Sequence, residues 1–90
     1  MQELNNDVKQ KLKTALAQVV KNHRKKQQKS ISKISAEIMM TKSMWTDLER
    51  GIKDPQFTTI WKISEALNIP LEDIITEVKL ILGEDFTLID

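Results

Sequence analysis

The chain is 90 residues long, which allows one small domain (residues 1–90) and leaves no room for a separate catalytic domain. It has no cysteine, which excludes disulfides and thiolate metal sites. Residues 1–53 carry twelve Lys and Arg against five Asp and Glu, whereas residues 54–90 carry two against eight. This asymmetry suits a face that binds a polyanion, but charged residues that only solvate helices explain it equally well.

Two Gly, two Pro and few aromatic residues predict an all-α chain. The first helix is expected over residues 6–27, where apolar side chains recur at helical spacing. The second is expected from Ser30 or Ser32 to about Met39. Its buried side would carry Ile31, Ile34, Ser35 and Ile38.

A third helix is expected from Lys42 to about Arg50. Thr41 is a suitable N-cap for it, and Gly51 favours the left-handed conformation that follows a helix. Trp45 falls on the buried side, so we expect it in the core rather than stacked on a base.

The acidic C-terminal part predicts two more helices and a tail. The fourth helix covers residues 56–67, and Asn68 can take the left-handed position after it. The fifth helix begins at Pro70 and runs to Leu82. Residues 84–90 form either a short strand or a packed extension, and Trp61 lies either at the edge of the core or in an interface. The buried residues of the fourth helix would be Phe57, Ile60, Ile63 and Leu67.

The most informative stretch, residues 34–51, reads ISAEIMMTKSMWTDLERG. It has a small residue near the start, a Ser/Thr cap, two apolar positions and a Glu-x-Gly ending. This stretch resembles the helix-turn-helix of the XRE family, the Cro and phage-repressor type, and the likeness extends over residues 30–74. The resemblance implies a five-helix, phage-repressor-like domain with its core at about 16–74, a long N-terminal helix and a short C-terminal extension.

The resemblance also implies roles for individual residues. The helix that begins at Lys42 would lie in the major groove of double-stranded DNA, and Glu49 would pair with Arg24 on the first helix. Lys29 is a further candidate for a phosphate contact. The base edges would be contacted by Lys42, Ser43, Thr46 and Asp47, and the DNA backbone by Ser30, Lys33, Thr41, Arg50 and Lys53.

Three positions depart from the family pattern. Ile31 stands where the family often has Gln, and Lys29 replaces an apolar residue. Met39 replaces the common Gly of the turn, where a left-handed backbone costs a non-Gly residue roughly 1–2 kcal/mol.

The fifth helix carries more apolar residues than one buried stripe needs, which suggests a partner surface. We expect residues 71–90 to form a homodimer interface, with simple packing of the tail as the alternative. The expected interface residues are Ile75, Val78, Ile81, Leu82, Phe86 and Leu88.

The sequence therefore predicts a DNA-binding transcriptional regulator, a dimeric repressor that reads a near-palindromic operator. An antitoxin-type or other protein-interaction module, with a toxin as partner, is the alternative. No cluster of residues suited to catalysis, a metal or a cofactor is present, so no enzyme is expected. The chain has neither a secretory signal in Met1 to Asp7 nor a membrane span, so we expect a cytoplasmic protein.

Overall fold

The computed structural model describes the backbone of residues 2–89 and the side chains of residues 7–89. The tail after residue 83 forms turns and bends, so the strand, one of the two expectations for it, is wrong. The all-α, five-helix prediction is confirmed. The helices are α1 (Gln2–Lys26), α2 (Ile31–Glu37), α3 (Lys42–Glu49), α4 (Phe57–Leu67) and α5 (Leu71–Leu82).

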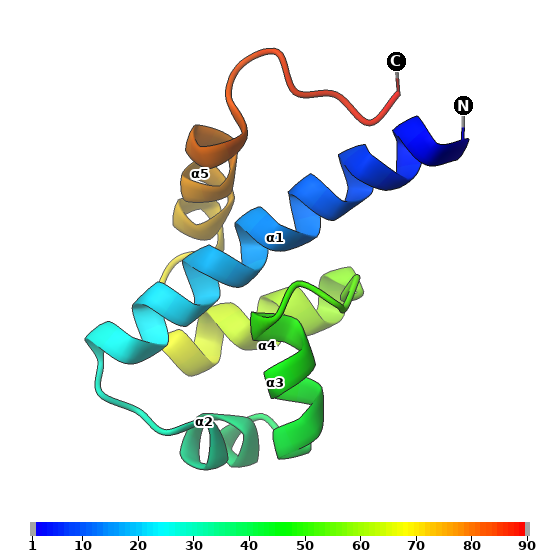
Figure 1. The fold of residues 1–90 in the computed structure, drawn as a ribbon. Helices are drawn as coiled ribbons and strands as arrows, with labels where there is room; N and C mark the ends of the chain where they lie inside the picture. The colour runs from blue at the N-terminus through cyan, green and yellow to red at the C-terminus, as the bar shows by residue number, and fades with distance from the viewer. Residues whose placement is uncertain (1, 90) are drawn as a thin grey trace.

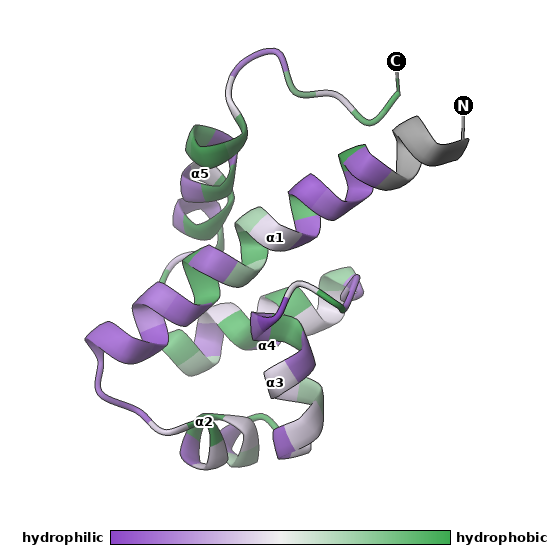
Figure 2. Ribbon diagram, viewed as in Figure 1, coloured by the Kyte–Doolittle hydropathy of each residue, from purple (hydrophilic) through white to green (hydrophobic). Residues whose placement is uncertain are grey.

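Helix α1 forms the axis of the molecule, which measures 40 × 24 × 21 Å. Helix α5 packs on one side of α1, and α3 and α4 pack on the other, with α2 held against α3 and α4 (Figure 1). Hydrophilic residues cover the last turns of α1 and its connection to α2 (Figure 2). Among the described residues, no helix has the length and apolar character needed to cross a membrane. The largest fully buried side chains are Val19, Val20, Ile34, Trp45, Ile63, Leu67 and Ile74.

The expected burial of α4 is correct at Ile63 and Leu67 but wrong at Phe57, which is 63% exposed. At 3.6 residues per turn, Phe57 lies about a quarter turn away from the buried stripe. It packs edge to face against Trp61, with ring centroids 6.0 Å apart, and Trp61 is itself about half exposed. The first turn of α4 therefore presents an aromatic pair outside the core.

Both short helices of the helix-turn-helix begin at the expected caps. The Ser30 hydroxyl accepts a hydrogen bond from the Lys33 amide at 3.1 Å, and the Thr41 hydroxyl accepts one from the Met44 amide at 3.0 Å. Ser35, the small residue in the second half of α2, is buried, and its hydroxyl donates to the Ile31 carbonyl at 2.7 Å. The hydroxyl is thus satisfied, and Ser fits where a bulkier residue would separate the two helices.

Gly51 ends α3 for two physical reasons. Its φ of +73° lies in the left-handed region, and a Cβ atom there would stand 3.3 Å from the Thr14 hydroxyl on α1. The Gln10 side chain donates to the Gly51 carbonyl at 2.9 Å, which fixes this turn on α1. Asn68 takes the expected left-handed position after α4, with φ +55°.

Met39 lies in the turn between α2 and α3, at the position where the family commonly has Gly. Its backbone is left-handed, as expected for that position, with φ +57°. Its side chain is 94% exposed, so it contributes almost no packing. Met39→Gly is therefore expected to raise the free energy of unfolding by roughly 1 kcal/mol, measured by urea denaturation.

Two variants serve as controls for this prediction. Gln28→Gly, at φ +59°, should also stabilise the protein. Ala36→Gly, at an exposed position inside α2, should destabilise it by about 1 kcal/mol. A loss of stability in Met39→Gly would contradict this account of the turn.

Candidate nucleic-acid interface

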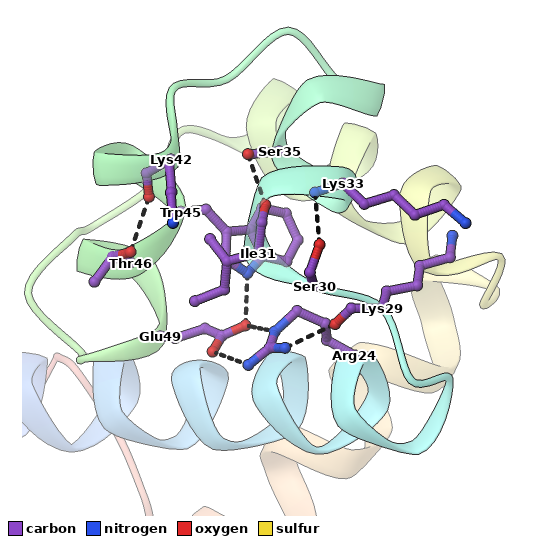
Figure 3. A network of polar contacts seen from close by, with 10 residues as sticks. All are labelled: Arg24, Lys29, Ser30, Ile31, Lys33, Ser35, Lys42, Trp45, Thr46 and Glu49. Atoms are coloured by element: carbon purple, nitrogen blue, oxygen red, sulfur yellow. Dashed lines mark hydrogen bonds and ion pairs between the residues drawn. The ribbon is translucent and has the colours of Figure 1, made fainter.

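The last turn of α3 is fixed to the molecule by the carboxylate of Glu49 (Figure 3). Its Oε2 accepts from Arg24 Nε and from the indole N–H of Trp45, both at 2.5 Å, and its Oε1 accepts from Arg24 Nη2 at 2.9 Å. The Arg24 Nη1 donates to the Lys29 carbonyl at 2.8 Å. The expected pairing of Arg24 with Glu49 is confirmed. It also joins α1 and α3 to the loop that leads into α2.

This network is largely shielded from water. The side chains of Arg24 and Glu49 are 11% and 5% exposed, and Trp45 is fully buried, so its expected place in the core is confirmed. The hydrogen bonds to Glu49 raise the pKa of Arg24 above its ordinary value, against the opposing effect of burial.

The outward side of α3 carries the residues expected to contact base edges. Lys42 and Ser43 are exposed in the first turn, and Thr46 and Asp47 are half-buried one turn further on. The Thr46 hydroxyl donates to the Lys42 carbonyl at 2.9 Å, so its proton is already used within the helix (Figure 3). The first two turns of α3 thus offer an ammonium, a hydroxyl and a carboxylate on one side.

The residues expected to contact the DNA backbone are all exposed. Ser30, Lys33 and Thr41 precede α3 in the sequence, and Arg50 and Lys53 follow it. Ser30 and Thr41 use their hydroxyl oxygens as cap acceptors and can still donate their protons. Within residues 7–89, no ion pair engages Lys33, Arg50 or Lys53. Their positive charges therefore remain available to a polyanion.

Lys29 has a different environment from these lysines. Its ammonium donates to Glu37 at 3.2 Å and to the Ala66 carbonyl at 3.1 Å. The Gln27 amide donates to the next carbonyl, that of Leu67, at 2.6 Å. These bonds satisfy carbonyls at the end of α4, so Lys29 holds α2 and α4 together rather than standing free for a phosphate. The sequence could not predict these bonds, because side chains that cap a distant helix follow no regular spacing.

Ile31, at the position where the family often has Gln, is partly buried and packs against the core. It therefore supplies packing where the family supplies a polar contact. Met44, in the first turn of α3, is 42% exposed. Its exposure follows from its place at the edge of the buried side, which the sequence pattern alone leaves ambiguous.

A second exposed surface lies between α4 and α5. Phe57, Trp61 and Ile75 line a groove of about 970 Å³ there, together with the charged residues Glu72 and Lys79. The Phe57–Trp61 spacing of four residues, displaced from the buried stripe, is the signal that could have identified it.

The residues expected in a dimer interface do not form one patch. Val78 is 5% exposed and belongs to the core, because α5 packs this face on α1, so its expected place in an interface is wrong. Ile75 lines the α4–α5 groove, whereas Ile81 and Leu82 line a separate groove against α1. Phe86 is partly buried and Leu88 is half exposed in the tail.

The arrangement of α2 and α3 defines a helix-turn-helix protein, and comparison with known proteins specifies its kind. The sequence profile of the helix-turn-helix family matches residues 20–74. The chain belongs to this family, in its XRE type, and is a DNA-binding regulatory protein.

One solved structure with the same fold is the clp gene regulator ClgR from C. glutamicum. The TM-score is 0.71, with 19% sequence identity, over 74% of this chain and 87% of that chain. No curated protein matches the chain in sequence.

The shielded network predicts a large cost for breaking it. Glu49→Gln leaves the charge of Arg24 without its partner, so we expect the free energy of unfolding to fall by about 3 kcal/mol. Glu37→Gln breaks the more exposed pair with Lys29 and should cost less than about 1 kcal/mol. Urea denaturation of both variants tests the difference, and equal losses would contradict the role given to Glu49.

Proposed function

We propose that the protein is a sequence-specific transcriptional regulator that reads bases through the first turns of α3. The observation that carries this proposal is the contrast between the two sides of α3. Trp45 and Glu49 are fixed within the protein, whereas Lys42 and Ser43 are exposed beside the N-terminus of the helix. A helix held in this way can enter the major groove with its N-terminal residues toward the base edges.

The side chains of this turn match the chemistry of base edges. Lys42 can donate to guanine O6 or N7, and Asp47 can accept from the cytosine N4 amino group. Ser43 can donate or accept, and Thr46 keeps an acceptor oxygen. Such a set favours G·C pairs at the positions that it contacts.

The proposed contacts to the DNA backbone supply affinity without sequence information. Lys33, Arg50 and Lys53 would approach phosphates as unpaired charges. Ser30 and Thr41, at the starts of α2 and α3, would donate hydroxyl protons to phosphate oxygens, next to the positive ends of the helix dipoles.

The proposed active form is a dimer on a near-palindromic operator. A second copy would cover the α4–α5 groove, where Phe57 and Trp61 expose apolar surface. The residues that line this groove include both acids (Glu65, Glu72) and Lys79, so a two-fold axis can bring opposite charges of two copies together. Two copies of α3 would then meet half-sites about one DNA turn apart. Repression by such a dimer needs only occupancy of the operator.

The double substitution Lys42→Ala and Ser43→Ala is expected to change the sequence that the protein selects from random duplex DNA. The wild-type protein should select a two-fold symmetric consensus, and the variant should lose preference at one or two positions of each half-site, because it lacks those base contacts. An unchanged consensus in the variant would contradict this assignment.

The matched controls are two single variants, Arg50→Ala and Lys53→Ala. These variants should bind all DNA more weakly, with the consensus unchanged. The slope of log affinity against log salt should become shallower by about 0.9 for each phosphate that the variant no longer neutralises.

The dimer predicts a distinct effect of Trp61→Ala. The wild-type protein should sediment as a dimer at micromolar concentration and Trp61→Ala as a monomer, because the groove loses its largest apolar side chain. Leu80→Ala, at an exposed apolar position outside the groove, should remain dimeric. A monomeric wild-type protein would overturn this interface and favour the antitoxin-type alternative, in which a different protein covers the groove.

A further inference from the structure

Helix α3 exposes one large apolar side chain, that of Met44, among the polar residues of its first turns. Its neighbours Trp45 and Leu48 are buried, whereas 42% of Met44 is open to solvent. The Met44 amide donates to the Thr41 cap, so its backbone position is fixed at the N-terminal end of the helix. The partly exposed Met44 is therefore held near the end of the helix that lies closest to the bases in a DNA-reading helix.

Met44 lies between two sets of residues proposed to contact DNA. On the helix surface it neighbours Asp47, three residues further on. On its other side it lines a groove of about 330 Å³ with Met40, Leu48 and Lys53. Met40 and Leu48 make part of this groove apolar, whereas Lys53 and Asp54 add charged residues to it.

We infer that Met44 recognises a thymine in each half-site through the C5-methyl group of the base. This inference rests on the proposed function and names one base that the helix reads. A thioether is at best a weak acceptor, so against an amino or carbonyl edge it would displace water without replacing the hydrogen bonds. The thymine methyl is the apolar group that bases present in the major groove, and contact with it removes apolar surface from water on both sides.

The test uses the full chain and the duplex that it selects. Each thymine of the half-site is replaced in turn by deoxyuridine, which lacks only the C5-methyl group. At one thymine the wild-type affinity should fall about fourfold, the value that corresponds to burying one methyl-sized group. Met44→Ala should bind the thymine and deoxyuridine duplexes alike at that position.

Two further variants make the result specific. Met44→Leu keeps an apolar side chain and should retain a preference for thymine, and thermal unfolding checks that both Met44 variants are folded. Met39→Ala changes another exposed methionine outside α3 and should respond to deoxyuridine as the wild-type protein does.

Three results would overturn the inference: no deoxyuridine effect in the wild-type protein, an equal effect in Met44→Ala, or a selected half-site without thymine. Each leaves base readout by Lys42 and Ser43 intact. Failure to select any consensus would instead contradict the proposed function, and the inference with it.

Discussion

The carboxylate of Glu49 is the point on which the arrangement of the helix-turn-helix depends. It accepts hydrogen bonds from Arg24 of α1 and from the buried Trp45 of its own helix, and Arg24 also binds the carbonyl of Lys29. A charge with so little access to water is stable only while its partners remain in place. The network therefore sets the position of α3 relative to α1 and to the start of α2. The exposed side chains of α3 take no part in this network, so they can differ in type without disturbing it.

This separation of the two sides of α3 explains the uneven charge of the chain. Twelve of the fourteen Lys and Arg lie in residues 1–53, which contain α1, α2 and α3, whereas eight of the thirteen Asp and Glu lie in the part that contains α4 and α5. Unpaired cations on the proposed DNA-binding side would raise affinity for a polyanion, and acids on the other helices would disfavour binding of DNA to other faces. The same acidic part contains the apolar α4–α5 groove, so the proposed dimer contact lies away from the proposed base contacts.

Local rules account for most of what the sequence could predict. The caps at Thr41 and Asn68 depend only on neighbouring residues, and the burial of Trp45 follows from helical spacing. Contacts between distant helices were beyond those rules. Lys29 binds the end of α4, and His23 lies 2.9 Å from both carboxylate oxygens of Glu77 on α5, because the tertiary fold brings these elements together. The exposure of Phe57 and the burial of Val78 depend in the same way on which helix packs against which face.

The absence of natural cysteine allows a direct test of where α3 lies on DNA. A single cysteine at Ser43→Cys can carry an iron chelate that cleaves nearby DNA, and Leu80→Cys on the outer side of α5 serves as the control. On the duplex selected by the wild-type protein, the account predicts cleavage from position 43 at one place in each half-site and little cleavage from position 80. Cleavage from position 80 rather than 43, or cleavage spread evenly along the duplex, would contradict the claim that α3 is the recognition helix.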